Sequence, residues 1–406
     1  MQKFEKHSPV VVTEVTTKHE LRQFMQYPNR LYADNPNYIP LFYGDGLSDW
    51  TPGKNPAFDY CEARCWLARR DGEIVGRIGA ILSHKANDKF GTHRMRFSQV
   101  DFVDDSEVSA ALFGTVERWA REKGCDQVHG PLGFTDMDRE GMLVEGFDRR
   151  SLFFTNYNAP YYLEHLTRLG YRKDVDWIEY RITVPEPGGA EAERLHKLSE
   201  FILKRKHLHV ATVHHKSEYG PFVRQVFELV NAAYAPLYGV VELSDEQIER
   251  YANKFIPLVD PDFVCFVVDE QDQLVAFGVT ALDPSVALKH SDGRLFPFGW
   301  AGVLNDLHHS DTLIMLLTAV RPDLQAEGIN AVMMDHICQS CNRHGVRFAE
   351  TGPMLELNDH ILAQWKRLEK EQHKRRRCFI KDLDHDVNAA NAAAAQTETP
   401  ETESAE

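Results

Sequence analysis

The chain has 406 residues, of which 43% are hydrophobic, 26% are charged and 11% are aromatic. This composition is typical of a globular protein and excludes intrinsic disorder, a collagen helix and a small disulfide-stapled domain. The length allows about two or three domains, each with its own core. The 46 Lys and Arg residues against 61 Asp and Glu residues give a formal net charge of −15, which argues against a broad basic surface for nucleic acid.

The cysteines and the apolar runs indicate a cellular compartment. The seven cysteines are odd in number and scattered through apolar sequence, as expected in a reducing environment. The longest apolar runs, residues 263–268 and 313–320, are too short to span a bilayer, and the first residues show no apolar signal core. We therefore predict a cytoplasmic protein, with peripheral contact at the inner membrane as the alternative.

The first part of the chain has the pattern of one α/β unit. Residues 60–82 alternate around Asp71-Gly72, which predicts a β-hairpin. After a predicted strand at 95–103, the segment 104–106 offers N-cap side chains to a helix that ends at Gly124. The remaining elements predicted here are a strand at 128–132, a helix at 160–169 and a strand at 177–184.

The second part repeats this order of elements. The pattern predicts a helix at 219–234, a hairpin at 263–282, a strand at 312–320, a helix at 330–343, a strand at 346–355, a helix at 359–368 and a strand at 376–383. Two units of similar order indicate a duplicated fold.

A boundary separates the two units at Pro185-Glu-Pro-Gly-Gly189, which breaks both periodicities. We expect a first domain at 1–185 and a second domain at 190–384. An acidic tail at 385–406 is expected to be disordered, because it has too few apolar side chains to offset the entropy of ordering. The amphipathic helix predicted at 194–208 has a basic end at 204–206, so it either packs as a solvated helix or contacts a membrane surface.

The most specific local motif lies at residues 320–330, Val-Arg-Pro-Asp-Leu-Gln-Ala-Glu-Gly-Ile-Asn, where a predicted strand enters a predicted helix. Such a junction directs several unpaired backbone N–H groups and the positive end of the helix dipole at one place. This geometry suits a pyrophosphate group.

The motif resembles motif A of the GNAT acyltransferases, in which Gln or Arg, two residues, Gly, one residue and Gly or Ala wrap the pyrophosphate of coenzyme A. Gln325, Gly328 and Asn330 occupy those places, so the third place departs from the family pattern. The resemblance implies an α/β fold with two GNAT-like domains, each a mixed sheet flanked by helices. It also implies acyl-CoA or an acyl-carrier protein as a co-substrate that is not permanently bound, with Val320, Gln325, Gly328, Ile329 and Asn330 around it.

A second GNAT motif flanks the pantetheine and the acyl thioester, and residues 348–368 resemble it. By this resemblance Asn358 holds the pantetheine, although its position before a predicted helix suits an N-cap better. The first unit lacks the phosphate-binding turn, because Asp104 and Asp105 stand where a pyrophosphate would bind. We therefore expect the thioester donor in the second unit.

The least regular stretch of the chain is the connection at 130–162 in the first unit. A connection of this length in a compact domain is more often functional than passive. Two interpretations stay open, namely an acceptor site and an interdomain clamp held by ion pairs. The candidate substrate-binding residues are Asp136, Asp138, Arg139, Glu145 and Asn156.

This connection and the duplicated organisation resemble a bacterial family of tandem GNAT-type N-acyltransferases, near the bacterial ceramide synthases. The resemblance implies transfer of an acyl group from a thioester to an amine, with a long-chain, sphingoid-like amine as one acceptor. Two alternatives stay open: O-acyl or aminoacyl transfer on the same scaffold, and an inactive GNAT-fold module that binds a lipid, a thioester or a protein.

Acyl transfer to an amine needs a base, because the ammonium must lose a proton before attack, and it gains from an acid that protonates the departing thiolate. Glu350 and Glu356 bracket the strand end nearest the expected thioester. Tyr157 and Tyr161 are phenols beside the long connection. These four residues are the candidate catalytic groups.

Two further features suggest binding sites but have simpler explanations. Cys338 and Cys341 are three residues apart on a predicted helix. A single pair at this spacing is explained more simply by two side chains that face the core than by a zinc site, so we expect no metal. The basic run at 374–377 either contacts a phosphate, a carrier protein or anionic lipid, or forms a solvated turn.

Overall fold

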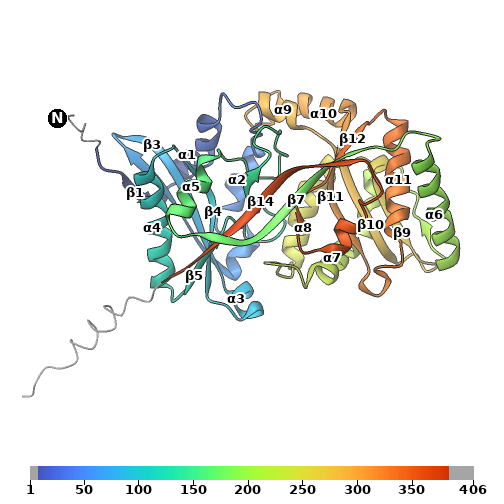
Figure 1. Cartoon of the computed structure of the whole chain (residues 1–406), viewed down its shortest axis with the longest axis horizontal. Coiled ribbons are helices and arrows are strands. Elements are labelled where there is room, and N and C mark those ends of the chain that lie inside the picture. The colour runs from blue at the N-terminus through green and yellow to red at the C-terminus, as the bar shows by residue number, and fades with distance from the viewer. Residues whose placement is uncertain (1–7, 384–406) are drawn as a thin grey trace, which may run out of the picture.

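The computed structural model describes residues 8–383, and its strands form one continuous mixed sheet. The strand order is β1-β2-β3-β4-β5-β14-β7-β12-β11-β10-β9-β8. Figure 1 shows β7 and β14 running through the middle, between a first half (residues 8–171) on the left and a second half (residues 184–369) on the right. Helices flank both halves, so the predicted α/β class with mixed sheets is confirmed.

The first half follows the predicted order of elements. The hairpin predicted at 60–82 is confirmed, and Asp71 and Gly72 occupy its turn with φ of 51° and 84°. The strands are β1 (Val11–Glu14), β2 (Cys61–Arg70), β3 (Glu73–Ser83), β4 (Arg94–Phe102), β5 (Gln127–Gly130) and β6 (Met142–Glu145). The helices are α1 (Lys18–Leu31), α2 (Tyr43–Asp49), α3 (His84–Phe90), α4 (Ser106–Glu122) and α5 (Tyr161–Arg168).

The second half repeats the order with additional helices. Sequence patterns predict β11 and α11 with the observed bounds, but they do not predict α8, α9 or α10. The strands are β8 (His209–Val210), β9 (Val264–Val268), β10 (Leu274–Leu282), β11 (Thr312–Val320), β12 (Phe348–Glu350) and β13 (Met354–Leu355). The helices are α6 (Ala190–Lys206), α7 (Gly220–Tyr234), α8 (Asp245–Phe255), α9 (Ser285–His290), α10 (Gly299–His309), α11 (Asn330–Arg343) and α12 (Asp359–Ala363).

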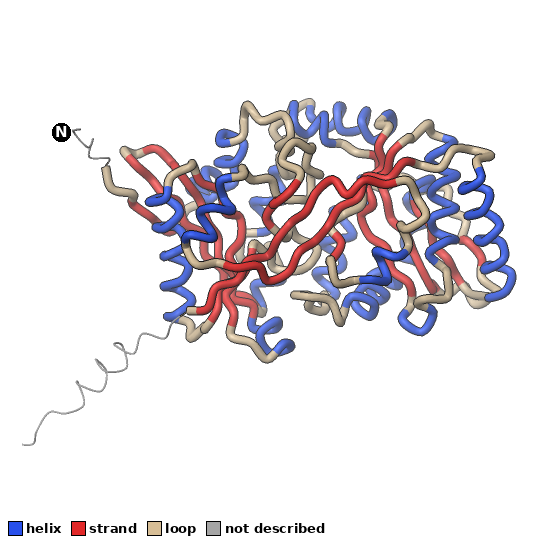
Figure 2. The backbone as a smooth tube through the Cα atoms, in the orientation of Figure 1, coloured by secondary structure: helices blue, strands red, loops and turns tan. Residues whose placement is uncertain are grey.

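Two long strands join the halves, β7 (Arg172–Thr183) and β14 (Lys370–Asp382). They pair antiparallel along most of their length, and Figure 2 shows them crossing the molecule diagonally. At one end β7 pairs with β12 of the second half, and at the other end β14 pairs with β5 of the first half. The last strand of the chain thus completes the sheet of the first half. The division at 1–185 and 190–384 stays a prediction, and the tail at 385–406 lies outside the described residues.

The basic run at 374–377 lies within β14, so the predicted solvated turn is wrong. The side chains of Lys374 and Arg376 are fully buried, because alternate residues of a strand face one side of the sheet. Both cations pair with the buried Glu179, at 3.1 Å from Lys374 Nζ and 2.5 Å from Arg376 Nε. The positive charges hold the pKa of Glu179 at about 2 against the opposing effect of burial.

Each half has its own apolar core, and a third cluster joins them. In this joining cluster, Phe42 and Phe153 of the first half pack with Leu288, Val303 and Ile314 of the second. The two halves therefore form a continuous packed body around the central strands. None of the helices in residues 8–383 has the length and the apolar character needed to cross a bilayer.

Candidate active site

The site lies where β11 and β12 separate. These two strands pair in parallel from Thr312 opposite Phe348 to Ile314 opposite Glu350 and no further. Beyond this point β11 continues to Val320 beside β10, while the chain after Glu350 turns through Gly352-Pro353 into β13. One edge of β11 therefore lacks a neighbouring strand, which leaves backbone groups open to a ligand.

The first cavity beside this edge is the apolar pocket, with a volume of about 740 Å³. Asn330, at the start of α11, lies at its wall. The remaining wall is largely apolar and comes from β10, β11, α11 and α12, including Met315, Leu317, Met333, Ile337, Cys338, Cys341, Ala349 and Trp365. Such a lining suits an aliphatic chain.

Cys338 and Cys341 are buried and free, and both face the apolar pocket. Burial raises the pKa of these thiols to about 11 and about 12. They are therefore neutral apolar surface at physiological pH, in agreement with the core-facing interpretation.

The second cavity, which we call the β11 cleft, has a volume of about 890 Å³ and contacts both halves of the molecule. It shares Met315, Leu317 and Trp365 with the apolar pocket, so the two cavities are adjacent. The second half supplies most of its wall, including residues 315–318 of β11, residues 351–355, Tyr234, Tyr238 and Asn358. The first half supplies two carboxyl groups, Asp136 and Glu140.

These two carboxyl groups differ from most charged groups in the protein. Among the described residues, neither Asp136 nor Glu140 has a hydrogen-bond or ion-pair partner in another residue. Burial, reinforced by Asp138, raises the pKa of Asp136 to about 6. Burial and the neighbouring Asp136 raise the pKa of Glu140 well above its usual range. Near neutral pH, Asp136 is thus mostly ionised, and Glu140 holds its proton more strongly than an ordinary carboxyl group, which gives the cleft a base beside a weaker acid.

The turn before α11 brings the predicted donor-binding residues together. Gln325 Nε2 donates to the carbonyl of Val320 at 3.2 Å, and Gly328 has φ of 84°. No side chain caps the helix at Ile329. Among the described residues, the N–H groups of Gly328, Ile329 and Asn330 have no hydrogen-bond acceptor. An exposed turn with three unpaired donors is the arrangement that binds phosphate oxygens.

A helix packs beside this turn. A Cβ built on Gly328 would lie 3.0 Å from Ile202 Cδ1 of α6. Lys206, at the end of the same helix, pairs with Glu327 of the turn at 2.7 Å. The basic end of α6 therefore lies next to the unpaired N–H groups and adds positive charge to the turn.

The predicted catalytic glutamates lie outside both cavities. Glu350 is buried, and its Oε2 is 3.2 Å from Lys374 Nζ. Glu356 pairs with Lys173 at 2.5 Å and with Arg375 at 3.2 Å. In this structure both carboxylates neutralise cations of the central strands.

The predicted catalytic tyrosines also make structural contacts. Tyr157 accepts a hydrogen bond from Asn35 Nδ2 at 2.6 Å. Tyr161 donates to the carbonyl of Phe102, and its ring packs edge-on against that of Phe102. Asn358 lines the β11 cleft and caps α12, because its Oδ1 accepts from Ile361 N at 3.3 Å.

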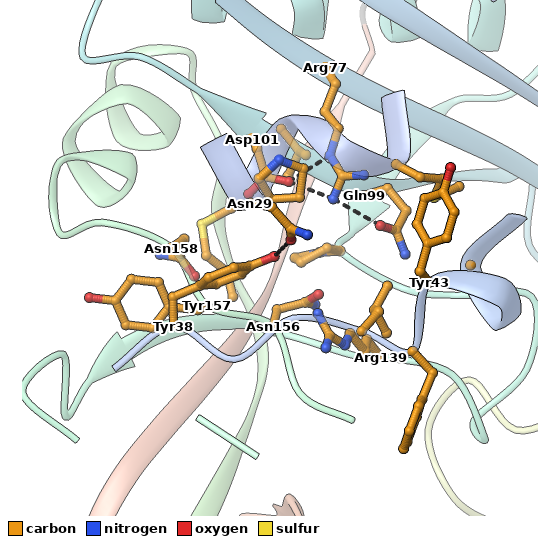
Figure 3. A pocket seen from close by; sticks show the side chains of 18 of the residues that line it. Asn29, Tyr38, Tyr43, Arg77, Gln99, Asp101, Arg139, Asn156, Tyr157 and Asn158 are labelled. Atoms are coloured by element: carbon orange, nitrogen blue, oxygen red, sulfur yellow. Dashed lines mark hydrogen bonds and ion pairs between the residues drawn. The ribbon is translucent and has the colours of Figure 1, made fainter. Parts of the chain in front are cut away.

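The connection at 130–162 divides its predicted substrate-binding residues among different places. Asp136 faces the β11 cleft. Asp138 shapes the connection, since its Oδ2 accepts from Phe134 N at 2.8 Å. Glu145 is exposed on β6 and pairs with Arg375 at 3.3 Å. Arg139 and Asn156 line a separate cavity, the first-half pocket, together with Tyr157 (Figure 3).

Sequence reasoning missed Glu140, Tyr234 and Tyr238. The four-residue spacing of Glu140 from Asp136 in an irregular acidic segment was the only available signal. Tyr234 lines the β11 cleft and donates to the carbonyl of Thr318 at 2.8 Å. Neither tyrosine stands in a motif of its own.

Tyr238 connects the second half to the first. Its hydroxyl donates to Asp174 Oδ2 at 2.5 Å and lies 2.9 Å from His129 Nδ1. Together with Cys378, Asp174 and His129 form the one group of metal-type ligands with atoms close enough to share an ion within residues 8–383. The tyrosine hydroxyl lies among these atoms, so hydrogen bonding accounts for the cluster.

Comparisons with known proteins agree with this geometry. No protein-family model matches the chain. The chain is 27% identical over 379 residues to Protein YghO of Escherichia coli strain K12, covering 92% of this chain and 95% of that protein. It is 28% identical over 300 residues to a bacterial ceramide synthase of Caulobacter vibrioides, covering 72% of this chain and 75% of that protein.

A solved structure shows the same architecture. A tandem GNAT protein from the clavulanic acid biosynthesis pathway superposes with a TM-score of 0.52 and 13% identity, covering 93% of this chain and 99% of that one. The structural match establishes the fold, and the two sequence relatives extend over most of the chain. The chain therefore has the fold of a tandem GNAT protein, and over most of its length it is similar in sequence to a bacterial protein described as a ceramide synthase.

Proposed function

We propose that the protein is an N-acyltransferase that moves an acyl group from a CoA or acyl-carrier thioester to an amine in the β11 cleft. The observation that carries this proposal is the pair of unpartnered carboxyl groups, Asp136 and Glu140, at the wall of an otherwise largely apolar cleft. An ammonium ion is the substrate group that this pair of carboxyl groups best accommodates, because it neutralises the negative charge of an ionised carboxylate.

The donor would bind along α11 and the open edge of β11. Its pyrophosphate would accept hydrogen bonds from the N–H groups of residues 328–330, with Gln325 and Lys206 nearby. Backbone N–H groups on the open edge, toward Val320, would polarise the thioester carbonyl. The acyl chain would occupy the apolar pocket, whose lining is continuous with the cleft through Met315 and Leu317.

The two carboxyl groups would divide the proton transfers between them. The amine enters as an ammonium ion, releases one proton to solvent and attacks the thioester carbonyl carbon through its nitrogen. Asp136 accepts the second proton from that nitrogen as the amide forms. The carbon–sulfur bond breaks, and Glu140 donates its proton to the departing thiolate. The products are an amide and a free thiol, and proton exchange with solvent restores both carboxyl groups.

A long-chain, sphingoid-like amine is the acceptor that we propose. The sequence relative from Caulobacter vibrioides is described as a ceramide synthase, and the wall of the β11 cleft is largely apolar. Such an acceptor resides in a membrane, so we propose a cytoplasmic protein that makes peripheral contact at the inner membrane. Phe201 of α6 is 57% exposed and lies beside the basic residues Lys204 and Arg205, which supports that contact.

Substitution of the carboxyl groups tests the proposal. The full-length protein would be assayed with short and long acyl thioesters against amines and alcohols. We expect Asp136→Asn to lower kcat/KM by about 10²- to 10⁴-fold, because general base catalysis contributes that much, while donor affinity is unchanged. Asp148→Asn is the matched control, since Asp148 lies on the same connection with an exposed carboxylate.

Two outcomes would reject parts of this assignment. Donor binding without turnover on any amine or alcohol would favour an inactive binding module. Full activity in both Asp136→Asn and Glu140→Gln would remove the carboxyl pair from the mechanism.

A further inference from the structure

The first-half pocket has a volume of about 660 Å³ and lies apart from the β11 cleft, on the other side of the segment 131–141. Its wall combines apolar residues with a group of polar side chains (Figure 3). The apolar part comprises Met25, Pro28, Leu41, Phe42, Val100 and Met142. Polar side chains, among them Asn29, Gln99 and Asn156, share this wall with the apolar ones, so the pocket suits a ligand that has both polar and apolar parts.

One pair of charges in this pocket is already neutralised. Arg77 Nε donates to Asp101 Oδ2 at 2.7 Å, and its other nitrogens donate to the carbonyl of Phe24 and to Gln99 Oε1. The second oxygen of Asp101 accepts from the hydroxyl of Tyr32 at 3.1 Å. Arg77 and Asp101 therefore need no ligand.

Arg139 is different, because no carboxylate pairs with it among the described residues. Its Nη2 donates a hydrogen bond to the carbonyl of Phe153. Its Nε is buried and has no partner in the described structure. Burial lowers the pKa of the guanidinium to about 10, with a smaller contribution from Arg77 and Arg376, yet it stays charged near neutral pH. A charge held in a buried position without a counter-ion is costly.

The neighbours of Arg139 add a further donor, and Asp101, the carboxylate that interacts with Arg139 at longer range, is already paired with Arg77. Gln99 Oε1 is engaged by Arg77, which leaves the amide nitrogen of Gln99 without a partner among the described residues. Asn156 Nδ2 donates to the carbonyl of Gly141 at 3.0 Å. Asp292 also lines the pocket, but it is exposed and forms no ion pair with Arg139 in the described structure. Figure 3 shows Arg139 extending toward Asn156, with Arg77 and Gln99 on the opposite side.

We propose that the first-half pocket binds the carboxylate group of a small amphipathic ligand, with the carboxylate on Arg139 and the apolar part against Leu41, Phe42 and Met142. The planar fork of a guanidinium matches the two oxygens of a carboxylate. A monoanion neutralises the one unpaired cation. A phosphate dianion would leave an excess negative charge near Asp101, so the pocket favours a carboxylate. The site is additional to the thioester and the amine of the proposed reaction.

Direct binding to the full-length protein tests this site without any assay of turnover. The probe is hexanoate, compared with hexanamide, which has the same chain without the charge, and with inorganic phosphate. We expect calorimetry to show that hexanoate binds. Hexanamide and phosphate should bind at least about tenfold more weakly, because the carboxylate forms a charge-assisted hydrogen bond. Arg139→Met lowers the affinity for hexanoate by about tenfold to hundredfold. Arg139→Lys keeps the charge but not the planar guanidinium, and it lowers the affinity less.

A surface variant and thermal unfolding distinguish binding from a structural role. Arg118→Met removes an exposed arginine of α4 and leaves hexanoate affinity unchanged. Because Arg139 has no counter-ion, Arg139→Met does not lower the unfolding temperature, whereas loss of a structural arginine would. Hexanoate raises the unfolding temperature of the wild type and not of Arg139→Met.

The proposal is overturned if hexanoate fails to bind the wild type or binds Arg139→Met equally well, since binding then belongs to another cavity. Tighter binding of phosphate than of hexanoate overturns the assignment to a carboxylate. None of these results depends on whether the protein acylates amines, so the failure of the proposed function would be seen separately.

Discussion

The two halves share one order of elements but differ at the helix that follows the fourth strand of each. In the first half, Asp105 caps α4 by accepting from the N–H groups of Glu107 and Val108 at 2.9 and 3.3 Å. Arg70 pairs with the same carboxylate at 2.5 Å. In the second half, α11 has no side-chain cap, and its first N–H groups are unpaired within the described structure. In the first half, the protein's own carboxylate therefore occupies the place that the second half leaves open at the start of its helix.

The cavities beside these helices differ in the same way. The apolar pocket of the second half has few polar groups, whereas the first-half pocket contains Arg77, Asp101 and Arg139. The two halves are thus related scaffolds, of which the second has a largely apolar pocket and the first has charged side chains in its pocket. The first half also sends Asp136 and Glu140 into the cleft of the second. The comparison shows that two unequal halves together form the wall of one cleft.

The largest predicted effect concerns pH and the carboxyl groups that the first half supplies. Asp136 acts as a base only when ionised, and burial raises its pKa to about 6. The ionised fraction falls as the pH drops below this value, so kcat/KM falls about tenfold per pH unit below about pH 6 and levels off above it. Steady-state kinetics across this range, with circular dichroism to verify the fold, measure the effect. A flat profile down to about pH 5 would exclude Asp136 as the base.

A smaller effect, on donor affinity, is expected when Gly328 in the turn before α11 is replaced. Gly328→Ala places a methyl group at φ of 84° beside the unpaired N–H groups, 3.0 Å from Ile202, and we expect donor affinity to fall by about tenfold. Gly345→Ala is the matched control at the other end of α11, because Gly345 also has a positive φ, of 70°, and open space around it. Both variants place a methyl group at a positive φ, so equal donor affinity in the two would show that the turn holds no phosphate.

The apolar pocket predicts a change in acyl-chain selectivity. Gly278 of β10 lines this pocket, and a Cβ there would first meet Met333 at 3.8 Å. Gly278→Leu should therefore fill part of the cavity and reduce the preference for long over short thioesters by about fourfold per displaced methylene. Gly114→Leu on α4 is the control, since a Cβ at Gly114 meets nothing within 4 Å. Unchanged selectivity would place the acyl chain elsewhere.

The smallest effect is expected from the cap of α4. Asp105→Ala removes the cap and the pair with Arg70, which should cost about 1 kcal/mol of unfolding free energy and leave donor affinity unchanged. Chemical denaturation and calorimetry measure the two quantities. A change in donor affinity would indicate that the first half also contacts the nucleotide and would weaken the contrast between the halves.

Local patterns predicted most of the elements, because periodicity and capping act over a few residues. The turn at 325–330 was found in this way, since its sequence and its geometry are local. The pairing of β14 with β5 was not predictable, because the strands are separated by more than half of the chain. The ion pair of Glu350 was also not predictable from local patterns, because Lys374 contacts it only through the pairing of the central strands. Asp136 was found as a candidate, but its role next to Glu140 depends on a cleft wall that comes from the other half.

The pairing of the last strand with β5 has a consequence for how the protein is made. During synthesis, the first half leaves the ribosome with the edge of β5 exposed, and the strand that covers it arrives only when almost the entire chain has been translated. An uncovered edge invites pairing with other chains. A fragment that ends between the two halves would therefore expose the edge of β5, because the first half depends on the last strand of the chain to complete its sheet.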